Sequence, residues 1–206
     1  MNTVSIVCLG WGSLVWDPGD LPIEYTTPIE RAWLLDGPHL PVEFARHSNG
    51  GRMTLVLLPD RRLVPVLWSE MLVTDLDAAK RSLAMRECRR RDRQPVAEDR
   101  IQRFVDESCG CWTRNDDFRS QCADVVRQWA AHRDVEAVIW TDLPARFNGI
   151  NGQVPTSEQV IEFLRHREGQ ERQNAMEYIR KAPKQISTEY RSQIEEQLQW
   201  MPTGIV

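Results

Sequence analysis

Long apolar runs are absent from this sequence of 206 residues. The N-terminal stretch Val4–Leu9 is short and has no positively charged lead, whereas a signal peptide or a membrane span needs a longer stretch. We therefore expect no membrane association. A basic excess is also missing, because the formal net charge is −4. Dedicated nucleic-acid binders normally carry such an excess, so we expect no nucleic-acid partner.

Cysteines are few, and their number is odd. The five, Cys8, Cys88, Cys109, Cys111 and Cys122, lack the spacing of a disulfide framework, so we expect reduced thiols and a cytoplasmic location. Four of them could be considered a zinc set. Their closest pair is Cys-x-Cys, unlike the usual Cys-x2-Cys, and no neighbouring histidine completes it. We therefore predict ordinary thiols and no metal site.

The apolar content is sufficient for a real core, since hydrophobic residues make up 41% of the chain. This length allows one large domain, or one domain with a helical appendage. The eight tryptophans are many for the size. Each offers a large apolar face and one N–H donor, which suits a packed core or an aromatic-lined pocket equally well.

The first third of the sequence is typical of β-structure with short connections. Apolar and β-branched runs predict strands, and Asn49–Gly51 and Pro59–Asp60 provide turn residues between some of them. The predicted strands cover residues 4–9, 30–35, 53–58 and 63–68.

From Asp75 onward the pattern becomes helical. Asp75 is a suitable N-cap for a helix with apolar positions at Leu76, Ala79 and Leu83. Two more helices are expected over about 97–107 and 117–132, followed by a strand over 135–140.

Near the C-terminus, Thr156 and Gln159 match a capping box, which opens a helix that Gly169 is expected to end. Two polar helices around 171–181 and 187–199 can pack back on the domain or form a homodimer contact. We predict an α+β fold, a small mixed β-barrel or curved sheet flanked by helices. It comprises a domain over 1–155 and a helical extension over 156–206 packed on it.

A glycine-rich loop follows the first predicted strand. It comprises Gly10, Trp11, Gly12, Ser13 and Leu14. Glycines allow positive φ angles and let backbone N–H groups approach a ligand, which makes a concave anion site. The dinucleotide fingerprint is excluded, because Val15 stands where its third glycine would be and Pro18 blocks the helix. A strand-ending turn without a ligand remains open on local chemistry alone.

Glu87 is the second candidate residue. On a helix, Leu76, Leu83 and Glu87 lie within a few tens of degrees of one another, so Glu87 should point toward the interior. Burial would raise the pKa of its carboxyl toward the range of a general acid or base. An ordinary ion pair with Arg90 or Arg91 is an equally good interpretation at this point.

Weaker candidates lie near these segments. Ser13 with His47 as its base would lack the nucleophile elbow of hydrolases, so ligand orientation is the better role for Ser13. Glu43, Arg46 and His47 stand beside a strand and could line the rim of a pocket. The five arginines within 86–93 are more typical of a solvated helix end than of an anion-binding stripe.

The segment Leu9–Pro18 resembles the opening signature of the gamma-glutamylcyclotransferase superfamily, especially its ChaC-type branch, which typically reads Gly-Tyr-Gly-Ser-Leu-Ile-Trp-Asn-Pro. Trp11 replaces the tyrosine and Asp17 the asparagine. Leu83–Glu87 resembles the family's Leu-x-x-Arg-Glu segment. Phe44–Gly50 and Thr54–Leu57 resemble ChaC-type sequence more loosely. The resemblance covers about residues 4–90, and the Gly-Tyr that usually follows the glutamate is absent.

The resemblance implies an intramolecular aminolysis without metal or organic cofactor. Glu87 would be the general acid and base, and the loop Gly10–Leu14 would hold a small anionic gamma-glutamyl amine or peptide, releasing 5-oxoproline and an amine. A non-catalytic module that binds a small metabolite on the same fold is the alternative. Trp11 and the missing Gly-Tyr favour that alternative.

Overall fold

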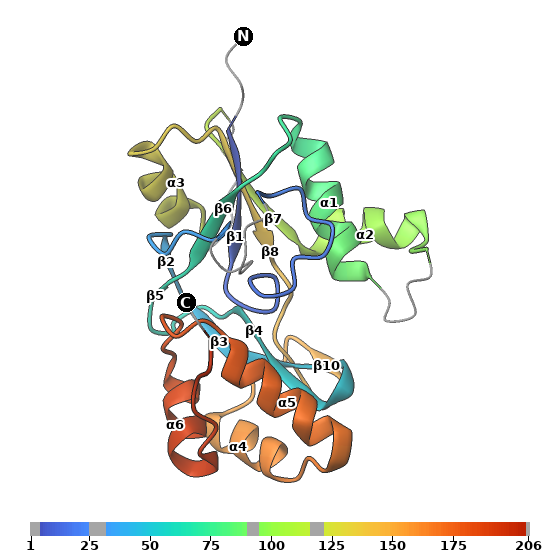
Figure 1. Cartoon of the computed structure of the whole chain (residues 1–206), viewed down its shortest axis with the longest axis vertical. Helices are drawn as coiled ribbons and strands as arrows, with labels where there is room; N and C mark the ends of the chain where they lie inside the picture. The colour runs from blue at the N-terminus through green and yellow to red at the C-terminus, as the bar shows by residue number, and fades with distance from the viewer. Residues whose placement is uncertain (1–4, 25–31, 90–94, 116–121, 205–206) are drawn as a thin grey trace. The chain divides into compact units, whose positions relative to one another are not determined.

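The computed structural model describes residues 5–24, 32–89, 95–115 and 122–204. It is a mixed α+β structure, which confirms the predicted class (Figure 1). Within these residues the sheets are open and none closes into a barrel. The curved-sheet alternative is therefore the one consistent with the structure.

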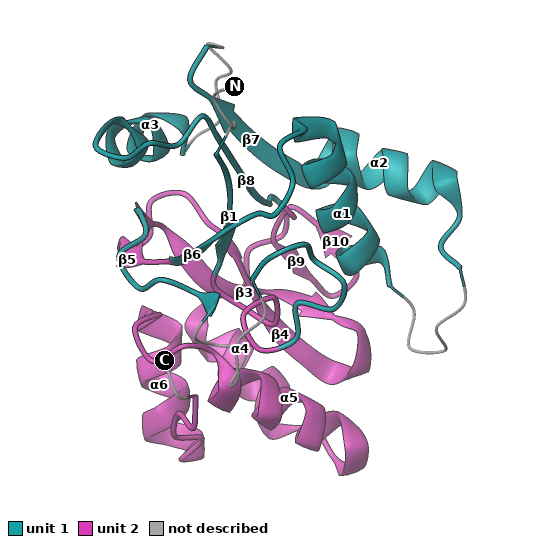
Figure 2. Ribbon diagram, turned by 45° about the horizontal axis from the view of Figure 1, so that its top comes forward, with its two compact units in different colours: residues 1–10, 17–38, 67–142 teal, residues 11–16, 39–66, 143–206 magenta. Residues whose placement is uncertain are grey.

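The chain forms two compact units, each built from three separate segments (Figure 2). The first unit comprises Met1–Gly10, Asp17–Pro38 and Leu67–Asp142. The second comprises Trp11–Trp16, His39–Val66 and Leu143–Val206. The division of the chain into a domain over 1–155 and a helical extension over 156–206 is not tested by these units and stays a prediction.

A four-stranded sheet with the order β6-β1-β8-β7 forms the first unit's centre. Its strands are β1 (Ile6–Gly10), β6 (Leu67–Glu70), β7 (Cys109–Thr113) and β8 (Ala137–Thr141). β1 is parallel to β8, whereas β6 and β7 are antiparallel to their neighbours. All five residues of β1 are buried, as expected for an apolar strand between two others.

Three helices flank this sheet, with α3 on one side and α1 and α2 on the other (Figure 1). They are α1 (Leu76–Cys88), α2 (Glu98–Ser108) and α3 (Ala123–Ala131). Asp75 caps α1 as predicted, since its Oδ1 accepts a hydrogen bond from the Ala78 N–H at 2.7 Å. The predicted helix over 117–132 is confirmed for 123–131, and its residues 117–121 lie outside the described residues.

The predicted strand over 30–35 is wrong for its described part. Residues 32–35 form no regular strand, and residues 30 and 31 lie outside the described residues. Only Leu34 pairs, by exchanging two backbone hydrogen bonds with Trp68 at 2.8 and 3.1 Å. The apolar residues there suited a strand, but the pairing stops after one residue.

The second unit has a sheet with the order β10-β9-β3-β4. Its strands are β3 (Val42–Ser48), β4 (Arg52–Leu57), β9 (Arg146–Phe147) and β10 (Ile150–Asn151). The 3-10 turn η2 (Asn49–Gly51) joins β3 to β4, with Gly50 and Gly51 at positive φ. A separate pair, β2 (His39–Leu40) with β5 (Val64–Pro65), completes the strands of this unit.

Three helices, α4 (Ser157–Arg165), α5 (Gly169–Lys181) and α6 (Glu189–Leu198), pack against this sheet, and α4 also packs against α6. The Thr156–Gln159 capping box is confirmed in both directions, at 3.3 and 2.9 Å. The prediction that Gly169 ends a helix is wrong. Gly169 is the first residue of α5, with φ +50°, and α4 already ends at Arg165.

None of the helices in the described part of the chain combines the length and the apolar character that crossing a membrane requires.

Candidate functional site

The glycine-rich loop begins where β1 ends. Gly10 closes β1 in the first unit, and Trp11–Trp16 belong to the second unit. A turn follows, in which the Val15 N–H donates to the Gly12 carbonyl at 3.0 Å. Trp11 and Leu14 are buried, whereas Ser13 is half-buried. The loop is therefore anchored by its apolar side chains around a single tight turn.

The reason for the two glycines differs from the predicted one. Neither Gly10 nor Gly12 has a positive φ among the described backbone angles. Instead, each is approached too closely for a side chain. A Cβ on Gly10 would meet a Trp33 ring carbon at 2.6 Å, and a Cβ on Gly12 would meet the Tyr178 hydroxyl at 2.5 Å. Close approach, not a left-handed backbone, is what requires glycine here.

Tyr178 of α5 is a loop contact that sequence reasoning missed. Its hydroxyl lies against Gly12 and accepts a hydrogen bond from the Leu55 N–H at 3.3 Å. The Trp11 Nε1–H donates to the Leu55 carbonyl at 3.4 Å. Trp16 contacts the Tyr178 ring edge-to-face, at 5.4 Å between centroids. The loop is thus fixed along the free edge of β4 by one residue from α5.

The signal for Tyr178 was present in the sequence but ambiguous. Ala175, Tyr178 and Ile179 form one apolar stripe at helical spacing, and all three are buried. Such a stripe predicts burial and does not tell which segment will lie opposite it. The contact partner, Gly12, comes from the other end of the chain.

Glu87 lies in the last turn of α1, and its side chain is 18% exposed. Its Oε1 accepts a hydrogen bond from the Arg86 Nη1 at 2.6 Å. The expected partners Arg90 and Arg91 lie outside the described residues. Glu87 is therefore mostly buried and forms an ion pair with its immediate neighbour.

The segment after the loop is held by the same end of α1. The Arg86 guanidinium donates from Nε and Nη2 to the Asp17 carbonyl, at 3.0 and 2.6 Å. Arg89 pairs with the Asp17 carboxylate at 2.8 Å. Within the first unit, Asp17 from the first sequence motif and Arg86–Glu87 from the second thus lie together.

β1 also lies within electrostatic reach of Glu87. Burial raises the pKa of the Cys8 thiol, and the Cys109 thiol and the Glu87 carboxylate raise it further. Arg86 acts in the opposite direction. Cys8 stands two residues before Gly10, where the loop begins. Glu87 therefore acts electrostatically on β1 within the first unit.

Glu43 is not a rim residue, contrary to the sequence interpretation. It is 1% exposed, and its carboxylate accepts hydrogen bonds from the Thr188 hydroxyl at 2.5 Å and from the backbone N–H groups of Phe44 and Tyr190 at 2.9 and 3.2 Å. Thr188 is the N-cap of α6. Burial raises the pKa of the Glu43 carboxyl, while these hydrogen bonds lower it in part. Glu43 therefore links β3 to the start of α6.

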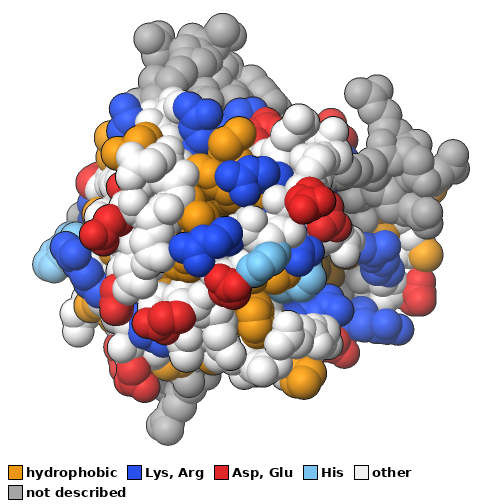
Figure 3. Space-filling model, turned by 90° about the horizontal axis from the view of Figure 1, so that it is seen from below, with side chains coloured by type: hydrophobic (Ala, Val, Ile, Leu, Met, Phe, Trp, Pro, Cys, Tyr) orange, Lys and Arg blue, Asp and Glu red, His pale blue; other side chains and the backbone are white. Residues whose placement is uncertain are grey.

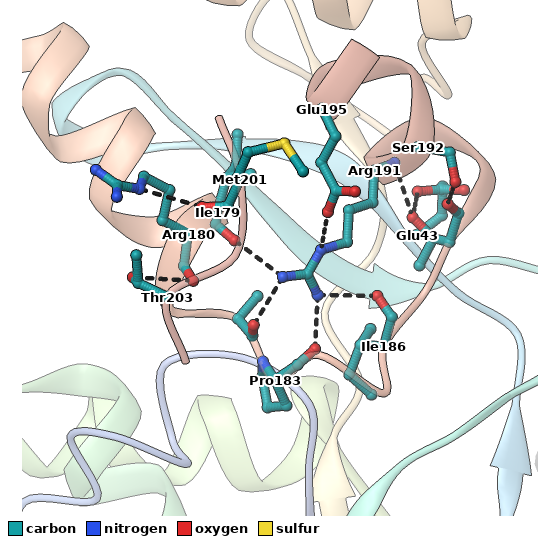
Figure 4. A network of polar contacts seen from close by, with 12 residues as sticks. Glu43, Ile179, Arg180, Pro183, Ile186, Arg191, Ser192, Glu195, Met201 and Thr203 are labelled. Atoms are coloured by element: carbon teal, nitrogen blue, oxygen red, sulfur yellow. Dashed lines mark hydrogen bonds and ion pairs between the residues drawn. The ribbon is translucent and has the colours of Figure 1, made fainter. Parts of the chain in front are cut away.

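Arg191 performs a matching role at the end of α5 (Figure 4). Its side chain is 3% exposed and pairs with Glu195 at 3.0 Å. The guanidinium also donates to a group of carbonyls at and after the end of α5, those of Ile179, Ala182, Pro183 and Ile186. The last carbonyls of a helix lack hydrogen-bond donors within the helix, and the Arg191 guanidinium provides donors for carbonyls at this end of α5.

The thiols and His47 show no arrangement suited to catalysis. Burial raises the pKa of Cys109 to about 12 and that of Cys122 to about 11, so both stay protonated near neutral pH. The His47 ring contacts Phe163 edge-to-face at 4.5 Å, and burial lowers its pKa. Within the described ranges, no three His, Cys, Asp or Glu side chains gather in a group that could hold a metal ion.

Comparisons of the chain with protein-family models, with curated proteins and with solved structures find no match.

Proposed function

We propose that this protein is a gamma-glutamylcyclotransferase-like enzyme. It releases 5-oxoproline and an amine from a gamma-glutamyl amine or peptide, with Glu87 as general acid and base. One observation carries the proposal. Within the first unit, Arg86 binds the Asp17 carbonyl and the Glu87 carboxylate at once. The two segments that resemble the family's signatures are thus joined by one guanidinium.

The chemistry is an intramolecular aminolysis. The Glu87 carboxylate removes a proton from the α-ammonium of the substrate, and the freed amine attacks the γ-carbonyl carbon. A C–N bond forms and closes the five-membered ring, while the carbonyl oxygen takes up the negative charge. When the oxyanion collapses, the bond to the leaving amine breaks and Glu87 returns its proton to that nitrogen. The ring nitrogen gives up its extra proton to the released amine, which leaves as an ammonium, so the products are 5-oxoproline with a neutral ring amide and the protonated amine. Because the nucleophile belongs to the substrate, no metal or organic cofactor is needed.

The loop supplies the groups that bind charge. We propose that its turn, which is closed by the hydrogen bond from Val15 to Gly12, offers backbone N–H groups to the substrate's anionic groups or to the oxyanion. Tyr178 and Trp11 hold the turn along β4, so the N–H groups are preorganised. Arg86 is a positioning residue, because its ion pair fixes the orientation of the Glu87 carboxylate.

A binding module without turnover is the second candidate. The ion pair between Arg86 and Glu87, at 2.6 Å, favours it, because a carboxylate already bound to a guanidinium must rearrange to take up a substrate proton. Trp11 favours it as well, because it stands where the family that the loop resembles has a tyrosine, so that hydroxyl is missing.

The experiment that tests both is incubation of the purified chain with glutathione and a series of gamma-glutamyl amines. Release of 5-oxoproline is followed by chromatography, and ligand binding by thermal shift on the same sample. The proposal expects 5-oxoproline from at least one compound. A thermal shift without product would reject the enzyme in favour of the binding module.

A further inference from the structure

Two arginines of the second unit stand side by side on neighbouring strands. Arg46 of β3 and Arg146 of β9 are direct partners in the parallel register of these strands. Paired residues on adjacent strands place their side chains on the same face of a sheet. The register therefore places two like charges next to each other, and both residues are half-buried.

Neither guanidinium has an acidic partner among the residues that the structure describes. Arg46 donates from Nη1 to the Pro144 carbonyl at 2.7 Å. Burial lowers the pKa of Arg46, and the neighbouring charge of Arg146 lowers it further. Like charges directly opposite each other are destabilising in a sheet. The arrangement is thus unfavourable for the protein alone and would be relieved by an anion.

The opposite face of β3 also carries positive charge. Burial lowers the pKa of His47, and Arg167 and Arg146 lower it further; His47 follows Arg46 on β3 and so points to the other face of the sheet. Glu171 acts on His47 in the opposite direction and pairs with Arg167 at 3.1 Å. The face of the molecule in Figure 3 mixes basic and acidic side chains instead of forming a uniformly basic surface. The net charge of −4 favours a small anion over a polyanion as the ligand of the arginine pair.

The pair lies in the same sheet that holds the loop. Arg46 is opposite Thr54 across β3 and β4, and the next residue of β4 is Leu55. Leu55 binds Trp11 through its carbonyl and Tyr178 through its N–H. The arginines are thus one and two strands inward from the edge strand that fixes the loop.

We propose that Arg46 and Arg146 together bind a carboxylate of a small-molecule ligand within the second unit. A guanidinium is planar and matches a carboxylate with two parallel hydrogen bonds, and two of them give a site that favours this geometry over a neutral amide. This anion site does not rest on the proposed function.

Calorimetric titration with glutarate, a dicarboxylate that cannot cyclise, tests the site without turnover. Arg146→Gln removes one charge and leaves the hydrogen bond from Arg46 to Pro144 in place. We expect it to weaken glutarate binding about tenfold or more, because a hydrogen bond to a charged group is lost. Lys184→Gln is the matched control in the same unit, since Lys184 is exposed and the charge change is identical. It should bind glutarate like the wild type.

Thermal unfolding without ligand separates binding from structure. A structural role for Arg146 predicts a lower Tm for Arg146→Gln, whereas an anion site predicts an unchanged or higher Tm, because repulsion with Arg46 is removed. Equal glutarate binding by the wild type and Arg146→Gln would overturn the proposal. Tighter binding of inorganic phosphate than of glutarate would overturn its assignment to a carboxylate.

The proposed function can fail independently. If no gamma-glutamyl compound is cyclised, but glutarate binds to the wild type and not to Arg146→Gln, the anion site is supported and the proposed enzyme is rejected. If 5-oxoproline is released, but Arg146→Gln binds glutarate like the wild type, the enzyme is supported and the anion site is rejected.

Discussion

Gly12 and Tyr178 depend on each other at the scale of single residues. The Tyr178 hydroxyl occupies the space of a Cβ on Gly12, at 2.5 Å. We predict that Gly12→Ala lowers the free energy of unfolding by about 1–3 kcal/mol, as is usual for overpacking. Tyr178→Phe alone should cost about 1 kcal/mol, because the Leu55 N–H loses its acceptor. Urea unfolding measures both.

The double variant provides the control. With the hydroxyl removed, an alanine at position 12 has room, so Gly12→Ala should cost less in the Tyr178→Phe background than in the wild type. Equal costs in the two backgrounds would show that the contact does not decide the residue at position 12.

The buried carboxyl of Glu43 should make the stability of the folded protein depend on pH. Burial raises its pKa in the folded state above the ordinary value of 4.5. The protonated form is therefore favoured by folding, and this contribution is present below pH 4.5 and is lost as the pH rises through the raised value. Relative to Glu43→Gln, which does not titrate, the wild type should lose stability as the pH rises from 4 to 7.

Urea unfolding of both proteins at several pH values measures this difference. Comparison with Glu43→Gln cancels the other titrating groups, including Asp142, whose pKa is also raised by burial. A stability difference that stays constant from pH 4 to 7, or one that grows in favour of the wild type, would contradict the account.

Residues that act through local chemistry could be predicted from the sequence. Asp75 and the Thr156–Gln159 pair were predicted as caps, because each acts on backbone groups three residues away. Tyr178 could not be predicted as a loop contact, because its partner Gly12 is distant in the sequence. Glu43 was misplaced for a related reason, since its burial depends on Thr188 and the start of α6.

At the scale of elements, the corner between α5 and α6 depends on Arg191. Its guanidinium binds carbonyls that the end of α5 leaves without partners, and it is nearly inaccessible to water. We predict that Arg191→Lys lowers the free energy of unfolding by about 3 kcal/mol, because an ammonium cannot reach the same acceptors and a buried group stays unpaired.

The control for this variant is Arg103→Lys, at an exposed position of α2. It should unfold like the wild type, within about 0.5 kcal/mol. Unfolding of Arg191→Lys at the same urea concentration as Arg103→Lys would mean that the corner is stabilised by other contacts.

Strands with polar or small residues were the elements that the sequence did not reveal. β7 reads Cys-Gly-Cys-Trp-Thr, with weak strand formers at its start, and it forms because β8 pairs with it along its whole length. Gly110 is needed there because the Trp140 indole occupies the place of its Cβ. β3 contains Glu43, Arg46 and His47, whose polar character concealed a strand that is buried for its first four residues.

At the scale of the whole molecule, the strand and helix patterns predicted the fold class correctly, but the order of these patterns along the sequence did not reveal the two units. The α+β character followed from strand patterns before residue 70 and helical patterns after residue 75. Each unit, however, is assembled from three separate segments, which depends on contacts between distant parts of the chain. The resemblance over residues 4–90 includes segments of both units, and the family assignment stays a prediction.

Some structural features of the candidate residues could be predicted, whereas their function as a site stays a prediction. Glu87 is mostly buried, as its helix position indicated, but it pairs with Arg86, which the spacing argument did not consider. The loop follows β1 as expected, although its glycines serve close contacts instead of positive φ angles. The arginine pair on β3 and β9 could not be predicted, because register between strands is set by tertiary structure.

The rate of 5-oxoproline release by Glu87→Gln is the measurement that tests the enzyme most directly. With the substrate that the wild type cyclises fastest, we predict a rate about 10²–10⁴-fold lower, the usual contribution of a general acid or base. Glu107→Gln, at an exposed position of α2, is the matched control and should keep the wild-type rate. Release of 5-oxoproline by folded Glu87→Gln at the wild-type rate would contradict the account.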